Sequence, residues 1–377
     1  MDFRENVSLA GFTTLGVGGP ARWFADAGSE GEVREALAFA AARSLPLFVL
    51  GGGSNLLVAD EGFPGVVLHM GLRGVRTTSQ GPVEILEVGA GEDWDRFVGV
   101  CVAGGLAGLE CLSGIPGTVG GTPVQNVGAY GQEVSSAIQS VRVLDRRSGE
   151  TREMTRTECA FGYRASVFNT VERDRFIVLR VTFTLPHGAA PALNYRDVKE
   201  YFAARTGAAA ALPSLAEVRN AVREIRARKA MLLVPGDPDC RSAGSFFKNP
   251  VVSEAQYAQI CEAAGADAPR FPAGAAAAGA FAAIGKDSTS TTTSTSAPSS
   301  PALVKVPAAW LIERAGFQRG HARGRAGISS KHTLALVNRG GATATEILDL
   351  AREVRDGVER NFGVKLEVEP VMLGGGP

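Results

Sequence analysis

The hydrophobic positions of the chain form two patterns, short apolar runs and longer stretches in which apolar residues recur at helical spacing. The apolar runs predict strands at 46–50, 66–69, 84–90, 141–144 and 176–185. Three amphipathic stretches predict helices, because each follows a serine or threonine with a glutamate three positions later, as in a capping box. These boxes are Ser29–Glu32, Ser214–Glu217 and Thr343–Glu346. We therefore expect an α+β fold.

Breaks between these elements divide the chain into three expected parts, 1–72, 73–212 and 213–363. The remaining segment, 364–377, begins with Val364–Glu369, whose alternating pattern predicts a terminal strand. Residues 272–300 change abruptly to alanine and glycine and then to an almost pure Ser/Thr tract. Such a tract buries too little apolar surface to order itself, so we expect a disordered insertion.

Composition excludes several classes of function. Lys+Arg and Asp+Glu balance at 39 each, which gives no support to binding of nucleic acid or a membrane surface. The five cysteines show no CxxC spacing, the N-terminus does not resemble a signal peptide, and no apolar run is long enough to span a membrane. A reducing cytoplasm is therefore the expected location. The four histidines do not cluster, so we expect no metal site.

Two glycine clusters are the main candidates for chemistry. The stretch from Cys111 to Gln132 carries no formal charge but contains six glycines, and a second cluster, Gly51-Gly52-Gly53-Ser54-Asn55, follows an apolar run. Glycine lets backbone N–H groups approach a bulky anion such as a diphosphate, although a structural glycine-rich turn is an equal alternative for the first stretch alone. Neither cluster matches a GxGxxG or Walker pattern. Together they suggest a large dinucleotide held from two sides.

Four motifs, LGGGSNLLV, GLECLSGIPGTVGGTPVQNVGAYGQEV, FGYRASVF and AGSFFKNP, resemble those of the UDP-N-acetylenolpyruvoylglucosamine reductase family. The resemblance covers nearly the whole chain apart from the expected insertion. It implies a flavoprotein whose first two parts form a non-Rossmann, vanillyl-alcohol-oxidase-like FAD-binding region, joined by the terminal strand. The third part would be a substrate-binding α/β domain. The type with a tyrosine loop that closes over the substrate is expected, as a monomer.

The resemblance also implies a reaction that completes a peptidoglycan precursor. NADPH would reduce FAD, and the reduced flavin would give hydride to UDP-N-acetylglucosamine enolpyruvate to form UDP-N-acetylmuramate. The residues expected to bind FAD come from both glycine clusters. They are Gly51, Gly52, Gly53, Ser54, Asn55, Leu56, Ser113, Gly114, Ile115, Pro116, Gly117, Gly120, Gly121, Gln125, Asn126, Gly128, Ala129, Tyr130 and Gly131.

Three residues are the catalytic candidates. Arg164 of FGYR would grip a carboxylate and stabilise an enolate, although most isolated arginines are simply exposed. Ser245 of AGSFF would donate the proton, although most serine hydroxyls serve turns. Glu369 would be the family's terminal glutamate, with Glu367 as a competitor on the same face of the expected strand.

The resemblance assigns substrate binding to Tyr195, Lys229 and Asn249. The alternatives are a half-buried aromatic and a solvated basic helix face that includes Arg223, Arg226 and Arg228. Arg325 has no assigned role. Two rival functions stay open: an FAD-dependent oxidase or dehydrogenase of small hydroxy acids, and a non-catalytic flavin sensor or sugar-nucleotide-binding protein. A sensor would need none of the three catalytic candidates.

Overall fold

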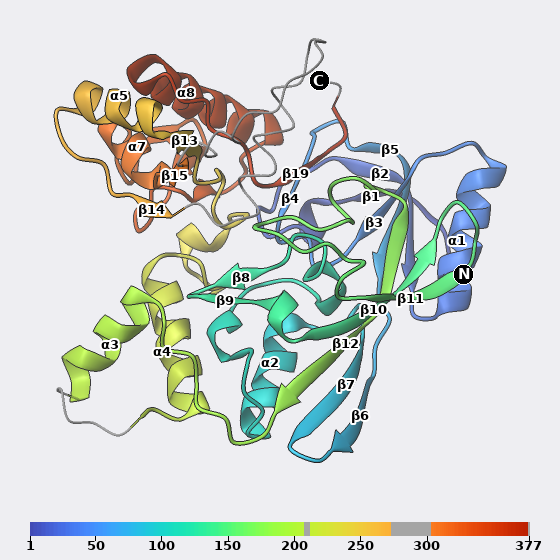
Figure 1. Cartoon of the computed structure of the whole chain (residues 1–377). Coiled ribbons are helices and arrows are strands. Elements are labelled where there is room, and N and C mark those ends of the chain that lie inside the picture. The colour runs from blue at the N-terminus through green and yellow to red at the C-terminus, as the bar shows by residue number, and fades with distance from the viewer. Residues whose placement is uncertain (207–211, 273–302, 376–377) are drawn as a thin grey trace, which may run out of the picture.

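A computed structural model describes residues 1–206, 212–272 and 303–375 of the 377-residue chain. It combines helices with mixed and antiparallel sheets in an α+β arrangement (Figure 1). The insertion expected at 272–300 lies outside the described residues except for Pro272. Within the described part of the chain, no helix is long and apolar enough to cross a membrane.

The first lobe is a four-stranded sheet in the order β1-β2-β5-β3. Its strands are β1 (Arg4–Ser8), β2 (Pro20–Ala27), β3 (Leu47–Leu50) and β5 (Phe63–Met70). β2 and β3 run parallel to β5 and β1 pairs antiparallel with β2, so the sheet is mixed. Helix α1 (Glu30–Ala42) packs on β5 and β2, and it begins where predicted, with the Ser29 side chain accepting a hydrogen bond from Glu32 N.

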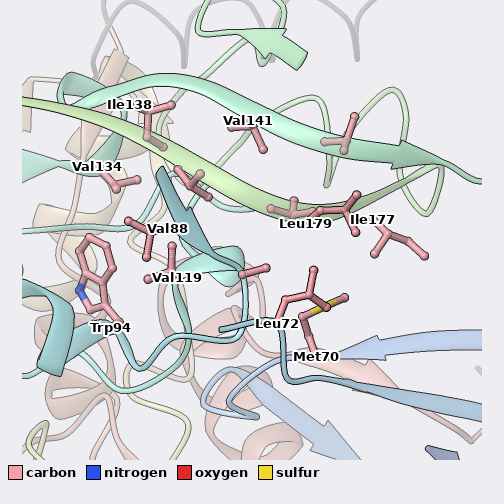
Figure 2. Packing of buried hydrophobic residues seen from close by; sticks show 14 of the residues in the cluster. Met70, Leu72, Val88, Trp94, Val119, Val134, Ile138, Val141, Ile177 and Leu179 are labelled. Carbon is pink, nitrogen blue, oxygen red and sulfur yellow. The ribbon is translucent and has the colours of Figure 1, made fainter. Parts of the chain in front are cut away.

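The second lobe is a five-stranded antiparallel sheet in the order β11-β10-β12-β7-β6. Its strands are β6 (Val75–Gln80), β7 (Val83–Gly89), β10 (Ile138–Asp145), β11 (Thr151–Thr155) and β12 (Phe176–Pro186). Helix α2 (Trp94–Ala103) buries Trp94 and Phe97 against this sheet. Figure 2 shows Trp94, Val119 and Val141 in the same apolar core as Met70 of β5. One hydrophobic core therefore joins the two lobes.

The glycine-rich stretch contains little regular structure. It holds the short elements η2 (Glu110–Leu112), η3 (Val119–Gly121), β8 (Gly128–Ala129) and β9 (Gln132–Glu133), with η4 (Val134–Ser136) just after it. Helices α3 (Arg196–Thr206) and α4 (Leu215–Arg228) pack against this stretch. Their cluster combines Val198, Val218 and Val222 with Cys111 and Tyr130. α4 therefore packs on the second lobe, although the sequence groups it with the third part.

The C-terminal region has a core of its own. Its strands are β13 (Val251–Ser253), β14 (Phe271–Pro272), β15 (Leu303–Lys305), β16 (Ala322–Arg323), β17 (Ala326–Ile328) and β18 (Leu336–Asn338). Its helices are η5 (Pro238–Cys240), α5 (Glu254–Ala264), α7 (Ala308–Arg314) and α8 (Ala344–Phe362). Figure 1 shows α5, α7 and α8 grouped above α3 and α4. As predicted, α8 starts with a Thr343–Glu346 capping box and ends at Gly363, which has a left-handed conformation.

Polar contacts attach this region to the first lobe. Asp60, in the turn between β4 (Leu56–Val58) and β5, accepts hydrogen bonds from Ala344 N (2.7 Å) and Thr345 N (2.9 Å) at the start of α8. Asn338 Nδ2 donates to Leu15 O at 3.0 Å. The first turn of a helix leaves N–H groups without intrahelical acceptors, so Asp60 supplies what α8 lacks.

The terminal segment corrects one expected boundary. Val364–Glu369 is not a strand; only Val368 makes an isolated bridge, to Phe247. The strand is β19 (Val371–Leu373), which pairs parallel with β4 in the first lobe. Val364 and Leu366 are still buried, because the alternation of side chains persists without a strand partner.

Candidate active site

A cavity of about 1370 Å³ lies where the lobes and the C-terminal region meet. It is lined by both glycine clusters, the FGYR turn, the end of α4, the segment around Ser245 and the terminal segment near Glu369. Pockets for single small ligands typically measure about 300–1,000 Å³. The cavity therefore has room for a dinucleotide and for part of a second ligand.

The two glycine clusters lie in contact with each other. A Cβ placed on Gly52 would lie 2.6 Å from Gly117 Cα, and one placed on Gly51 would lie 2.8 Å from Thr118 Oγ1. Gly53 has a φ of +59°, and a Cβ there would lie 1.8 Å from Phe12 O. Glycine is needed at 52 for close approach and at 53 for both space and conformation.

These loops present backbone donors and are tied together. In the part of the chain that the structure describes, the N–H groups of Gly52, Gly53 and Ser54 have no hydrogen-bond acceptor. The Asn55 side-chain nitrogen donates to Gln125 Oε1 at 3.1 Å and to Glu369 O at 3.4 Å, so it links the two glycine clusters and the terminal segment. Free N–H groups beside a large cavity fit the diphosphate of a dinucleotide.

Arg164 and Glu369 form an ion pair at the cavity wall. Arg164 Nε lies 3.1 Å from Glu369 Oε1. Arg164 has a φ of +53°, an uncommon conformation for a residue other than glycine, within the tight turn that joins Gly162 and Ala165. Burial raises the pKa of Glu369 above its ordinary value, and Arg164 and Lys248 only partly offset that effect.

The competing glutamate points elsewhere. The Glu367 side chain is 75% exposed and pairs with Lys248 at 3.2 Å, whereas that of Glu369 is 15% exposed. Glu369 lines the cavity. The expected alternation places both residues on one face, but the structure separates them. The segment packs beside Phe246, whose carbonyl accepts a hydrogen bond from Glu369 N at 2.9 Å.

Ser245 lies directly before Phe246, whose carbonyl makes the contact with Glu369 N. It follows Gly244, which has a φ of +72°, and it lines the cavity. Phe246 N donates to Leu334 O at 2.8 Å, so the backbone after Ser245 is held on both sides. Within residues 1–206, 212–272 and 303–375, the Ser245 hydroxyl has no hydrogen-bond partner. A turn hydroxyl would bond to a nearby backbone group.

Tyr195, Lys229 and Asn249 also line the cavity. The Tyr195 ring, just before α3, meets Tyr130 edge-on at a centroid distance of 5.4 Å. Lys229, at the end of α4, pairs with Asp197 of α3. Asn249 Oδ1 accepts a hydrogen bond from Ala308 N at 2.9 Å, at the start of α7.

Comparisons with known proteins agree with this site. The chain matches the FAD binding domain family over residues 21–155 and the C-terminal domain of UDP-N-acetylenolpyruvoylglucosamine reductase over residues 237–373. The UDP-N-acetylenolpyruvoylglucosamine reductase of Thermobifida fusca is 44% identical over 380 residues, covering 99% of this chain and 98% of the relative. The chain belongs to the UDP-N-acetylenolpyruvoylglucosamine reductase family.

Other members of the reductase family agree. The relative from Saccharopolyspora erythraea is 45% identical over 370 residues, covering 97% of this chain and 94% of the relative. A crystal structure of the reductase from Thermus caldophilus has a TM-score of 0.62 at 28% identity, covering 99% of this chain and 100% of that one. The predictions of an FAD-dependent oxidoreductase of this family and of an α+β flavoprotein fold are confirmed.

Most of the residues expected to bind FAD line the cavity of this reductase, but Ser113, Gly114, Asn126 and Gly131 do not. Ser113 is fully buried and donates to Glu110 O at 2.6 Å. Asn126 is also buried and accepts a hydrogen bond from Ser135 N at 3.2 Å. These side chains hold the loop in shape beneath the cavity, because their polar groups are already satisfied by the protein.

Gly114 shows how the loop is held from below. Its N–H donates to Asp95 Oδ1 at 2.6 Å, and its carbonyl accepts from Arg226 Nε at 3.1 Å. Arg226 is only 8% exposed, so it does not belong to a solvated helix face. Burial lowers the pKa of Arg226, opposed by Tyr130 and Asp95. The alternative of a solvated basic helix face is therefore wrong for Arg226, because α4 packs on the glycine-rich stretch with this face inward.

His332 is a cavity residue that sequence reasoning missed. It belongs to the segment SSKH at 329–332, which directly follows β17. Four histidines spread along the chain gave no signal, because a lone histidine has no spacing to recognise. Its place in the cavity depends on the folding of the segment around it.

Proposed function

We propose that the chain catalyses the NADPH-dependent reduction of UDP-N-acetylglucosamine enolpyruvate to UDP-N-acetylmuramate. The observation that carries the proposal is one cavity that combines two glycine loops, the Arg164–Glu369 pair and the unpartnered Ser245 hydroxyl. The glycine clusters around Gly52 and Gly117 would hold FAD, which would supply a two-electron carrier between NADPH and the terminal carbon of the substrate's double bond.

The chain's own groups act on the charge that develops in the substrate. As the terminal carbon gains hydride, negative charge builds on the carbon that bears the carboxylate and on the carboxylate itself. The Arg164 guanidinium donates hydrogen bonds to that carboxylate. Glu369 lies against Arg164 and helps to hold the guanidinium in place. Burial raises the pKa of Glu369, and in its protonated form its carboxyl would stabilise the same charge as a hydrogen-bond donor.

Ser245 completes the addition. Its O–H donates a proton to the carbon next to the carboxylate, which turns the double bond into a single bond, and the serine is reprotonated from water. A hydroxyl is a weak acid, but a carbanion is a strong enough base to accept its proton. Freedom from other hydrogen bonds leaves this hydroxyl available to the substrate.

The nucleotide sugar occupies the other wall of the cavity. Lys229, which pairs with Asp197, exchanges that partner for the diphosphate. Tyr195 closes over the sugar nucleotide from the segment before α3, and the Asn249 amide orients polar groups of the substrate.

Ser245→Ala tests the assignment of the proton donor. The variant should bind FAD and be reduced by NADPH at close to the normal rate, because that step needs no proton at the substrate carbon. Product formation should fall by about 10²–10⁴-fold, the usual contribution of a positioned acid. Ser245→Cys is the matched control and should retain more activity than alanine, because a thiol still carries a proton. Equal slowing of both half-reactions would contradict the assignment.

An anaerobic experiment tests the whole proposal against the oxidase alternative. The protein is reduced with NADPH, the enolpyruvyl nucleotide is added, and flavin absorbance is followed. Rapid reoxidation by the nucleotide is the expected result. If the nucleotide leaves the flavin reduced and oxygen admitted afterwards reoxidises it, the proposal is overturned.

A further inference from the structure

The segment that carries His332 is held by two acidic residues. Asp239, which is 6% exposed, accepts hydrogen bonds from Ser329 Oγ at 3.0 Å, from Ser330 N at 3.0 Å and from Ser330 Oγ at 2.6 Å. Lys331 pairs with Asp237. The three residues before the histidine, Ser329, Ser330 and Lys331, are thus anchored to η5 and its N-cap residue.

His332 lines the cavity. Its backbone N donates to Ser329 Oγ at 3.3 Å, but among the described residues neither ring nitrogen makes a hydrogen bond. Three charged groups face it: Lys229 at the end of α4, Glu313 of α7, and Arg319 in the turn after α7. Burial, followed by Lys229, lowers the pKa of His332 to about 4, while Glu313 acts in the opposite direction. The ring is therefore neutral in the free protein at neutral pH.

We propose that His332 binds the diphosphate of the nucleotide sugar and takes up a proton from solvent as the ligand arrives. The inference rests on the proposed function, which supplies a nucleotide sugar as the substrate. A hydrogen-bonded segment places His332 in the wall of the same cavity that Lys229 lines, and Lys229 is the residue proposed to meet the same diphosphate. Without ligand, a second cation there is unfavourable. A diphosphate reverses the sign of the local field, and a protonated imidazole then gains a charge-assisted hydrogen bond.

Proton linkage predicts how binding depends on pH. A group that is neutral in the free protein and charged in the complex makes binding tighter as the pH falls. The apparent affinity of the wild type should weaken a few-fold between about pH 5.5 and about pH 8. His332→Gln keeps an amide donor but does not titrate, so its affinity should stay constant over that range.

Calorimetry on the FAD-loaded protein measures the proton directly. UDP-N-acetylglucosamine is the probe, because its diphosphate is esterified at both ends and keeps a constant charge near pH 6. It also lacks the enolpyruvyl carboxylate, which would lie near Glu369 and could change the protonation of that residue as well. Titrations at about pH 6 in two buffers of different ionisation enthalpy should show uptake on the order of half a proton per ligand. His332→Gln should show almost none. His321→Gln, which alters a histidine paired with Glu353 on α8, is the matched control and should retain the uptake.

Several outcomes would overturn the inference. They are no uptake in the wild type, equal uptake in His332→Gln, or no binding of the probe at all. Turnover of the enolpyruvyl nucleotide is measured separately, so a failure of this inference is distinguishable from a failure of the proposed function. In turnover, His332→Gln should flatten the pH dependence of KM while leaving that of kcat unchanged, which a merely structural residue would not do.

Discussion

Replacing Gly52 with alanine tests whether the two glycine clusters must touch for the flavin site to form. The added Cβ would lie 2.6 Å from Gly117 Cα, 3.0 Å from Gly117 C and 3.3 Å from Thr118 N. Carbon atoms in ordinary contact lie about 3.5–4.0 Å apart. All three neighbours are backbone atoms, so none can rotate away. The two loops must move apart by about 1 Å.

The size of the effect follows from that clash. Forcing an extra methyl group into a packed site costs about 1–3 kcal/mol. If the cost falls on the FAD-bound state alone, the Kd for FAD rises by about 5–150-fold. If it falls on the folded apoprotein, the entropy of unfolding of 377 residues is about 0.8 kcal/mol per kelvin, so Tm falls by about 1–4 °C.

Flavin titration followed by fluorescence quenching measures the Kd for FAD, and thermal unfolding of the apoprotein measures Tm. Gly11→Ala is the matched control, because a Cβ there meets nothing within 4 Å and Gly11 does not have a positive φ. It should leave both quantities unchanged. Wild-type FAD affinity together with wild-type Tm in Gly52→Ala would refute the reasoning, since the contact between the clusters would then be unnecessary.

Two further predictions concern stability. Asp60→Ala removes the acceptor at the start of α8 and should cost about 1–2 kcal/mol in urea unfolding. Burial tends to raise the pKa of Asp60, but hydrogen bonds from Thr345 and Ala344 outweigh it and hold that pKa below its ordinary value. The stabilisation by Asp60 is therefore lost as pH falls through the folded pKa, below about pH 4. A loss of stability in Asp60→Ala that does not depend on pH would contradict this. Glu369 has the opposite sign: its pKa is raised by burial, so the favourable contribution of its neutral form is lost as pH rises above about pH 4. Glu369→Gln should therefore gain stability relative to the wild type between about pH 4 and about pH 8, and urea unfolding showing a constant difference would contradict it.

Local signals determined much of the secondary structure. The capping boxes at Ser29, Ser214 and Thr343 placed three helix starts, because a cap needs only residues within one turn. Apolar runs predicted β3, β7 and β12, because strands with partly or fully buried faces need apolar residues there, and these show as alternating or continuous apolar positions in the sequence. By contrast, β6 was missed. All six of its residues are exposed, and it is a strand only because β7 pairs with it.

The sequence also identified the family, which the comparisons confirm, and its motifs supplied the candidate site residues, whose roles stay predictions. It could not choose between Glu367 and Glu369, which share one side of the alternation, because the choice depends on Phe246 lying beside the segment. Nor could it distinguish glycine residues that line the cavity from Gly114, which is held beneath it.

Arg226 and His332 show most clearly what tertiary structure decided. Arg226 has the charge of a surface residue but lies buried under the glycine-rich stretch, because α4 docks with that face inward. His332 has no motif, yet Asp239, about ninety positions earlier in the chain, anchors the segment that presents its ring to the cavity. Local sequence determines helices, turns and the type of side chain available. Burial and partners come from segments distant in the chain, and these decide the charge state and the role of each side chain.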